Sequence, residues 1–250
     1  MKTLAKAIAA TTLALAGAQT MAADVGKGFN VSMNAGVVSN YIWRGITQSR
    51  DNGAIQGGLD VKHSSGAYVG TWMSSADFET SDSEAAAADI YMEQDIYAGY
   101  GFSAGDFSFD FRYTDYHYPG AGAADFSEVH GHVSAYGATL GADYSTDMPL
   151  TDEDSAFHYY ASYTHALPAD IGLTATVGEY DYKNRGWIGG SERSDSKYSY
   201  YSLGVNKTMI GINWGLTLTD TNVEDDNCAG FNGGKDYCDA AFTVSATKSL

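Results

Sequence analysis

The segment Phe107-Ser108-Phe109-Asp110-Phe111-Arg112-Tyr113 alternates aromatic and polar residues at every position. A repeat of two residues places the four aromatic side chains on one face of a β-strand and the polar side chains on the other. In a soluble sandwich the aromatic face would enter a core. In an outer-membrane barrel it would face lipid, and the charged face would line a wet interior. The pattern predicts a strand and leaves open which face meets water.

Similar alternation predicts about twelve strands along the chain, with ends uncertain by several residues. They are Phe29–Ile42, Ala54–Lys62, Ala67–Ser74, Asp89–Phe102, Phe107–Tyr113, Phe126–Ala135, Ala138–Ser145, Phe157–Ala166, Ile171–Tyr182, Lys197–Asn206, Ile210–Asp220 and Asp239–Leu250. A two-residue turn at Ala104-Gly105 would pair Phe102 with Phe107 and Tyr100 with Phe109, which keeps the apolar side chains of this hairpin on one face.

The gaps between the predicted strands alternate strictly between long and short. Six long gaps lie at Trp43–Gly53, Ser75–Ala88, Thr114–Asp125, Thr146–Ala156, Lys183–Ser196 and Thr221–Cys238, with five tight turns between them. Outer-membrane barrels have long loops outside the cell and short turns in the periplasm, whereas a soluble sandwich has no reason to sort its loops in this way. The sequence therefore predicts an all-β protein: a transmembrane antiparallel up-and-down β-barrel of about twelve strands.

The N-terminus is typical of an exported protein. Lys2 and Lys6 precede an apolar run from Ala7 to Ala18, and small residues follow up to Ala23. This order predicts a cleaved signal peptide over residues 1–22 and a single barrel domain over residues 23–250. Loss of the two lysines would change the formal net charge from −17 to about −19. No later stretch has the 18 or more consecutive apolar residues of a spanning helix, so a membrane would be crossed by strands.

Aromatic residues near the ends of the predicted strands suggest two interfacial girdles, because a ring that is half wet and half apolar suits the edge of a bilayer. The ordinary strand propensity of Tyr and Phe is the simpler explanation of the same enrichment. The girdle candidates are Tyr41, Trp43, Trp72, Tyr113, Tyr144 and Tyr159 toward the long loops, and Phe102 and Phe107 toward the turns.

One stretch resembles a known family. The segment from Ser39 to Asn52, SNYIWRGITQSRDN, is followed by AIQGGLD from Ala54 to Asp60, and both resemble the N-terminal signature of the TorF-type porin family of proteobacteria. Similar phrases are YVGTW from Tyr68 and DIYAGYG from Asp95. The resemblance is specific in the N-terminal third and implies an outer-membrane barrel with a pore. It implies no catalytic residue, and the family has no established substrate.

The polar face of the strands provides the candidate channel lining: Arg44, Gln56, Asp60, Lys62, Glu93, Asp95, Asp110, Arg112, Glu128, His130, His132, Asp143 and His158. A twelve-stranded barrel encloses a narrow interior, so passage of small solutes or ions is expected. Arg44 and Arg112 opposite Asp60, Asp95 and Asp110 would create a transverse field across a constriction. Alternatively, the same charges would simply pair inside a polar plug.

Cys228 and Cys238 are the only cysteines and lie in the last long loop. In an oxidising compartment such a pair is expected to form a disulfide. The predicted loops are also rich in acidic residues. They are expected either to be solvated or to share divalent cations with lipopolysaccharide, but none has the spacing of an EF-hand, and no metal site or cofactor is predicted.

Two alternatives to a channel stay open. A lipid hydrolase would use His130, His132 and Asp143 with Ser127 or Ser145, but the histidines have the parity of the interior and no G-x-S-x-G motif is present. A structural or surface-binding barrel would act through its acidic loops. Nucleic acid is excluded as a partner by the acidic charge, and the expected partners are outer-membrane lipid, lipopolysaccharide, small solutes and the barrel-assembly machinery. We predict a non-enzymatic channel of the outer membrane.

Overall fold

A computed structural model describes residues 22–79, 89–148, 155–183, 196–225, 227–228, 234 and 236–250. The predicted signal peptide falls almost wholly outside these residues. Among the described residues, no helix has both the length and the apolar character needed to cross a membrane.

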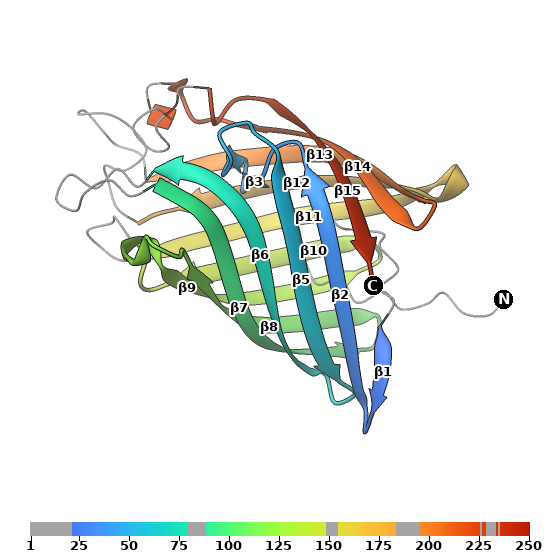
Figure 1. The fold of residues 1–250 in the computed structure, drawn as a ribbon. Coiled ribbons are helices and arrows are strands. Elements are labelled where there is room, and N and C mark those ends of the chain that lie inside the picture. Colours follow the sequence, from blue (N-terminus) through green and yellow to red (C-terminus); the bar gives the residue numbers. More distant parts are fainter. Residues whose placement is uncertain are drawn as a thin grey trace.

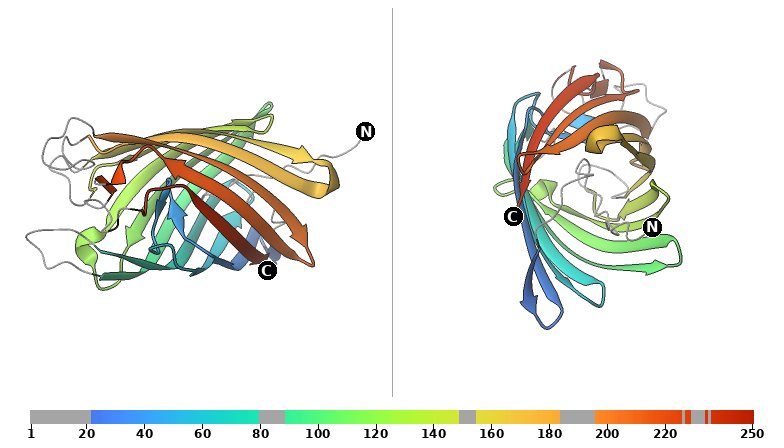
Figure 2. Two further views of the ribbon diagram at one scale, coloured as in Figure 1. Left: turned by 90° about the horizontal axis from the view of Figure 1, so that it is seen from above. Right: turned by 90° about the vertical axis from the view of Figure 1, so that its right-hand side faces the viewer.

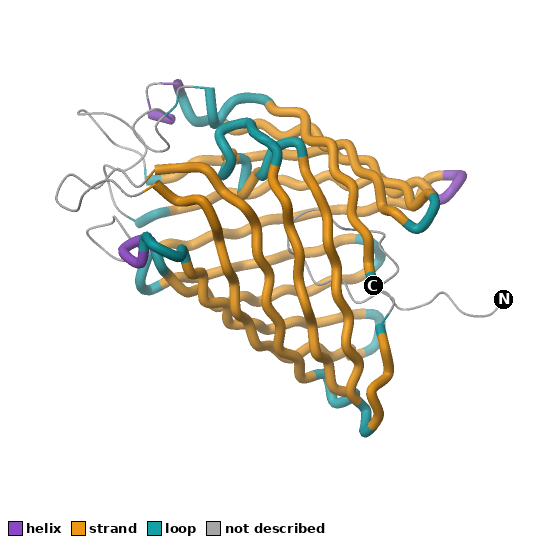
Figure 3. Tube along the Cα trace, in the orientation of Figure 1, coloured by secondary structure: helices purple, strands orange, loops and turns teal. Residues whose placement is uncertain are grey.

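Fifteen strands are described, together with 3-10 turns at Gly122–Ala124 and Pro168–Asp170 and helical residues at Asp225, Asn227 and Cys228. Figure 3 shows that strands dominate the described chain. The strands are β1 (Ala23–Gly26), β2 (Phe29–Val38), β3 (Ile42–Trp43), β4 (Ile46–Thr47), β5 (Ala54–His63), β6 (Ala67–Glu79), β7 (Asp89–Ala104), β8 (Phe107–His117), β9 (Phe126–Ala135), β10 (Ala138–Ser145), β11 (Ala156–Leu167), β12 (Ile171–Asp181), β13 (Lys197–Met209), β14 (Ile212–Thr221) and β15 (Ala241–Ser249).

Twelve of these strands form a closed antiparallel barrel, as predicted (Figure 1). Each strand from β5 to β15 pairs with its neighbour in sequence, and β2 closes the ring by pairing with both β5 and β15. Strand β1 folds back on the first residues of β2, which extend beyond the end of β15. The views along and across the barrel show the strands strongly tilted around one axis (Figure 2).

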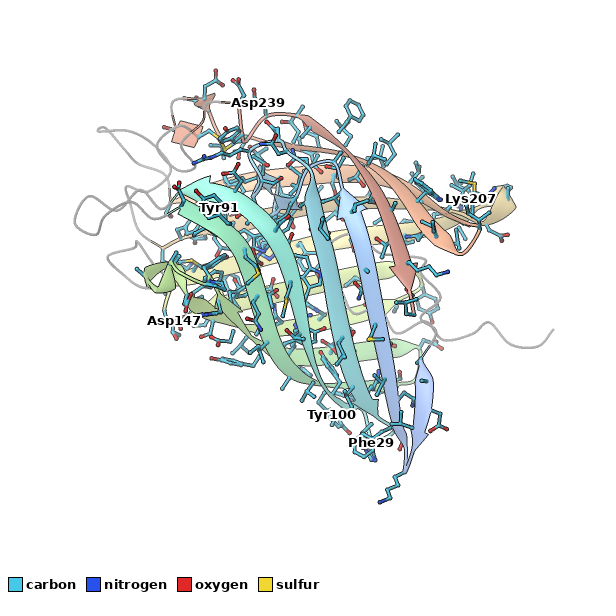
Figure 4. The ribbon with its side chains drawn as sticks, in the orientation of Figure 1. Phe29, Tyr91, Tyr100, Asp147, Lys207 and Asp239 are labelled. Atoms are coloured by element: carbon cyan, nitrogen blue, oxygen red, sulfur yellow. A yellow bond between two sulfur atoms is a disulfide. The ribbon has the colours of Figure 1, made fainter. Side chains whose placement is uncertain are left out.

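Long and short connections alternate around the barrel, and we call its two ends the loop end and the turn end. Figure 4 shows Tyr91, Asp147 and Asp239 at the loop end, and Phe29, Tyr100 and Lys207 at the turn end. One turn lies one residue later than predicted, at Gly105-Asp106, because Gly105 adopts a φ of 61° that favours glycine. Phe102 therefore pairs with Phe109 instead of Phe107, and the apolar face is unchanged.

The outer face of the barrel is apolar. Large hydrophobic side chains alternate with inward residues and are widely exposed, for example Ile55 at 72%, Val129 at 57%, Leu140 at 59% and Phe242 at 68%. A soluble monomer rarely exposes so continuous an apolar surface, so this belt needs an apolar environment. The opening segment follows the same rule: Phe107, Phe111 and Tyr113 are exposed on the outside, and Arg112 is buried inside.

The interior differs between the two ends. At the turn end, strands β9 to β14 present small polar side chains that pair across neighbouring strands, such as Ser134 with Thr139, Thr164 with Thr174, and Asn206 with Asn213. At the loop end it holds a packed core of tyrosines with smaller apolar side chains. The core includes Ile46, Ile90, Tyr116, Tyr118, Phe126, Met148, Tyr180, Tyr182, Tyr198 and Tyr200. The interior is therefore a packed aromatic core at the loop end and is lined by polar and charged side chains at the turn end.

Candidate functional site

The connection between β2 and β5 folds into the barrel as a small hairpin made of β3 and β4, and Arg44 and Gly45 form its tip. Both tip residues have positive φ, 48° for Arg44 and 93° for Gly45, as a two-residue hairpin turn requires. The base of the hairpin is held by side chains, because the Thr47 hydroxyl donates to Asn40 at 2.5 Å and the Ser49 hydroxyl accepts from the Tyr41 amide at 2.9 Å. These bonds make the hairpin a defined element.

The tip of the hairpin rests on the inner wall formed by β13 and β14. The Tyr198 hydroxyl donates to the carbonyl oxygen of Arg44 at 3.0 Å. A Cβ atom on Gly45 would lie 2.7 Å from Cβ of Tyr200 and 2.6 Å from Cγ2 of Thr221. Gly45 is thus required both by its φ and by the closeness of the wall.

The guanidinium of Arg44 is buried and neutralised. Its Nη1 and Nη2 donate to the two carboxylate oxygens of Glu128 on β9, at 2.7 and 2.8 Å, and Nη2 also donates to Asp143 on β10 at 3.1 Å. The guanidinium lies 4.2 Å from the ring centre of Trp43 and 4.8 Å from that of Tyr180. Charge pairing and cation–π contacts together fix the hairpin to the opposite wall.

Asp143 is the centre of a histidine cluster on three adjacent strands. Its carboxylate lies 2.9 Å from Nδ1 of His130, 3.1 Å from Nε2 of His132 and 2.7 Å from Nδ1 of His158. The remaining ring nitrogen of His158 lies 3.0 Å from the Tyr200 hydroxyl. We call His130, His132, Asp143 and His158 the histidine cluster, and all four are buried.

Tyrosine hydroxyls hold three carboxylates on the wall formed by β5 to β8. Tyr41 donates to Glu93 at 3.0 Å, Tyr97 to Asp60 at 2.7 Å, and Tyr68 to Asp110 at 2.8 Å. These bonds satisfy the carboxylates without using the cations of the interior.

Arg112 and Asp95 are less completely paired than Arg44. Arg112 forms no salt bridge within the described part of the chain, and its guanidinium lies 5.6 Å from the ring centre of Tyr97. Buried polar atoms with no hydrogen-bond partner among the described residues are Asp95 Oδ1, Arg112 Nε, Thr114 Oγ1 and His130 Nε2. They belong to the neighbouring strands β7, β8 and β9, so this part of the wall offers polar groups to the interior.

The candidate lining residues have inner-face positions, and the structure divides them into three groups. Arg44, Glu128, His130, His132, Asp143 and His158 form one connected network. Asp60, Glu93 and Asp110 are held by tyrosines, and Gln56 donates to Ser74 at 3.3 Å. Asp95 and Arg112 stand on the same wall, and Lys62 faces inward opposite Tyr68. Whether these side chains line a conducting path stays a prediction.

Three of the aromatic girdle predictions are wrong. Tyr41 is buried with its hydroxyl on Glu93, Trp43 packs on Arg44 and Phe126, and Trp72 packs edge-on against Tyr41 at 5.5 Å between ring centres. Tyr41 and Trp43 lie inside because residues 39–53 turn into the barrel. Trp72 lies inside because it is four residues from Tyr68 on β6 and faces the same side of the strand. Tyr113, Tyr144, Tyr159, Phe102 and Phe107 are exposed on the outer face, where an interfacial role stays a prediction.

Sequence reasoning missed the tyrosines of the interior. Tyr180 and Tyr182 occupy alternate positions on and just after β12, and Tyr198 and Tyr200 occupy alternate positions on β13. The signal that could have found them is their position in the strand: each lies an odd number of residues from Val177 or Tyr201, which face outward, and therefore faces inward. Aromatic character alone does not separate the two faces, because a tyrosine can pack inside when its hydroxyl has a partner.

The serine–histidine arrangement of a lipid hydrolase is not assembled in the described residues. Ser127 and Ser145 each donate to Asp147, at 2.8 and 3.0 Å, while His130 and His132 contact Asp143. Among the described residues, neither Ser127 nor Ser145 donates to a histidine, so these two serines are not placed as histidine-activated nucleophiles.

Cys228 and Cys238 form a disulfide, as predicted, and both sulfur-bearing side chains are buried in the loop-end core. The acidic segments of the predicted loops lie in large part outside the described residues. Of those described, Asp77 pairs with Arg50 at 3.2 Å and Asp147 is bonded to the two serines.

Solved structures with a similar fold include two porins. The KdgM porin matches with a TM-score of 0.50 and 7% identity over 88% of this chain and 99% of its own. The NanC porin matches with a TM-score of 0.51 and 9% identity over 87% of this chain and 97% of its own. At such identities the likeness concerns the fold. No curated protein sequence matches the chain. The model of the Gcw_chp family, described as a bacterial protein of unknown function, matches residues 22–250, and the chain belongs to that family.

Proposed function

We propose that this protein is an outer-membrane channel for small ions or solutes, constricted by the β3–β4 hairpin. The observation that carries the proposal is the pairing of two opposite surfaces in one closed barrel: an apolar outside and a polar, charged inside. This inside-out arrangement is typical of membrane barrels that enclose an aqueous path. The likeness in fold to two porins and the resemblance to the TorF-type porin family support it.

The hairpin is proposed to set the size of the path. It occupies the loop-end half of the interior together with the tyrosine core, while the turn-end half is lined by polar and charged side chains. Twelve strands give a narrow barrel, so an element inserted into it restricts passage strongly. We expect low conductance in the wild type and a larger one when the hairpin is detached.

Charge favours cations over anions in such a path. The inward-facing acidic residues are Asp60, Glu93, Asp95, Asp110, Glu128 and Asp143, and the inward-facing basic residues are Arg44, Lys62 and Arg112. Charges of one sign in a low-dielectric passage raise the local concentration of the opposite ion. The excess of acidic groups therefore predicts cation selectivity.

In this setting the outer aromatic residues contact membrane lipid and lipopolysaccharide, and the barrel-assembly machinery inserts the exported chain. The first test is planar-bilayer recording of the purified protein under a salt gradient. Discrete conductance steps with a cation-selective reversal potential are expected. The absence of steps above those of lipid alone, for protein whose barrel is verified as folded, would overturn the proposal.

A further inference from the structure

The histidine cluster brings three imidazoles and one carboxylate together by strand register. Asp143 on β10 is the direct partner of His130 on β9 and of His158 on β11, and His132 lies two residues from His130 on the same face of β9. Side chains presented in this way from three adjacent strands are held by the backbone ladder. The arrangement is a rigid set of donors.

The spacing of the donor atoms suits a metal ion. The carboxylate oxygens of Asp143 lie 2.7 to 3.1 Å from the three nearest imidazole nitrogens, and the donor atoms of His130, His132 and Asp143 all lie within 4.8 Å of one another. In a tetrahedral zinc site with bonds of about 2.0–2.1 Å, neighbouring ligand atoms are about 3.3 Å apart. His130 and His132 both face Oδ1 of Asp143, whereas His158 faces Oδ2. Small side-chain movements would therefore bring His130, His132 and Asp143 around one ion, and His158 would turn toward it as the fourth ligand.

The unpartnered nitrogen of His130 is a second, independent observation. If His130 donates its Nδ1 proton to Asp143, its Nε2 is an acceptor facing Glu128 Oε2 at 3.9 Å, with no donor to satisfy it. A metal bound at Nδ1 requires the proton to sit on Nε2, where it points toward that carboxylate. A ligating histidine commonly directs its other N–H to such a group.

His158 shows the same arrangement. Its Nδ1 faces Asp143 and its Nε2 lies 3.0 Å from the Tyr200 hydroxyl, which can accept the N–H of a metal-bound ring. The groups that orient ligands in metal sites are thus present behind two of the three histidines.

The charges near the cluster allow a cation. Arg44 is held through two hydrogen bonds by Glu128, at 2.7 and 2.8 Å, so it keeps a partner if its longer 3.1 Å contact with Asp143 is released. The carboxylates of Glu128 and Asp143 carry two negative charges and the guanidinium of Arg44 carries one positive charge. One negative charge therefore remains beside the neutral imidazoles. Three nitrogen donors and one oxygen suit Zn²⁺, Ni²⁺ or Cu²⁺ better than Ca²⁺ or Mg²⁺, which prefer oxygen ligands.

We propose that His130, His132, His158 and Asp143 bind a divalent transition-metal ion of the zinc class inside the barrel. The proposal concerns binding and stands whether or not the barrel conducts. Because the site adjoins Arg44, an ion held there would couple β9, β10 and β11 to the hairpin contact.

The test uses Co²⁺ as a spectroscopic probe for the zinc site in the folded, detergent-solubilised protein. One equivalent of Co²⁺ should give the visible absorption of a four-coordinate site, and Zn²⁺ should abolish it by displacement. His132→Gln should weaken Co²⁺ binding by about a hundredfold, and Tyr200→Phe by about tenfold. His165→Gln is the matched control, because His165 is an exposed residue on the same strand as His158 and should leave binding unchanged.

X-ray absorption of the Zn²⁺-loaded wild type provides a measurement that needs no variant, and it should show imidazole ligands in a four-coordinate shell. The proposal is overturned if the wild type binds no Co²⁺ at one equivalent, if the folded His132→Gln variant binds as tightly as the wild type, or if His165→Gln loses binding to the same degree. A zinc shell without imidazoles would also overturn it.

Discussion

Arg44 and Glu128 lie 84 positions apart in the sequence and form a two-point salt bridge inside the barrel, with Nη1–Oε1 at 2.7 Å and Nη2–Oε2 at 2.8 Å. The pair joins a hairpin inserted between β2 and β5 to strand β9. Both side chains are almost fully removed from solvent, with 4% and 1% of their surface exposed. This contact would hold the proposed constriction in place.

Glu128→Gln should destabilise the folded barrel, because it removes the carboxylate that forms the two-point pair and leaves Asp143 as the remaining acidic partner of the buried Arg44 guanidinium. Removing one partner of a buried ion pair commonly costs about 3–5 kcal/mol in the free energy of unfolding. The measurement is urea-induced unfolding in lipid vesicles. Asp77→Asn is the control, because the Arg50–Asp77 pair is partly exposed and its loss should cost about 1 kcal/mol or less. Equal effects of the two variants would contradict the account.

Gly45→Ala should prevent the hairpin from docking. The new Cβ would lie 2.6 to 2.7 Å from Thr221 and Tyr200 at a φ of 93°. Gly120→Ala is a matched control, since Gly120 has a φ of 89° and nothing lies within 4 Å of its added Cβ. We expect the Gly45 variant to lose about 1–3 kcal/mol more stability than the Gly120 variant. The account fails here if the two unfolding free energies change by the same amount.

Leu140→Arg tests whether the apolar outer face is in lipid. Leu140 is 59% exposed on β10, so a charge there would be harmless in water. A buried position near the middle of a bilayer would instead cost about 2–4 kcal/mol. Unfolding free energies in phospholipid vesicles provide the measurement, with Ala123→Arg, at an exposed residue of the turn Gly122–Ala124, as the control. A Leu140 variant as stable as the control would argue against membrane burial of this face.

Asp95→Asn and Arg112→Gln should shift ion selectivity in opposite directions. Both residues face the interior, and each has a buried polar atom without a partner among the described residues. Removing the acidic group should lower the preference for cations, and removing the basic group should raise it. Reversal potentials under a salt gradient report both changes. If neither potential moves, these two side chains do not line the conducting path.

Reduction of the Cys228–Cys238 disulfide should lower the stability of the loop end. The bond closes a segment with a sequence separation of 10, and both cysteines pack in the loop-end core. Closing a loop of this size stabilises the folded state by roughly 2–3 kcal/mol. A double Cys228→Ser, Cys238→Ser variant should show the same loss without reductant and no further change on adding it. A reductant effect that persists in this variant would have another cause.

The sequence predicted the strands and the side that each residue faces where alternation was unbroken, as in the segment from Phe107 to Tyr113. Alternation is a local property, and the barrel follows from it together with the sorting of loop lengths. The alternation also predicts that Glu128, His130 and His132 on β9 and Asp143 on β10 face inward, because apolar outward residues such as Val129 and Leu140 define the opposite face of the two strands.

The assembly of the site could not be predicted in the same way. Arg44 reaches Glu128 because residues 39–53 fold inward, and a gap in the strand pattern shows only the length of such a segment. The sequence pattern predicts Tyr41 and Trp72 at the membrane interface, where aromatic rings are common. Aromatic rings are equally common in packed interiors, so residue type alone does not separate the two positions. The contact between Tyr41 and Trp72 depends on the hairpin, so the sequence of either strand alone contains no sign of it.

Single-channel recording of the wild type beside Glu128→Gln tests the central claim most directly. If the hairpin constricts a channel, the wild type should show small discrete steps, and the variant should show larger or more frequent openings because Arg44 is less firmly held. Gly120→Ala should conduct like the wild type. Identical conductance and gating in the wild type and a folded Glu128→Gln variant, or no steps from either protein, would contradict the account.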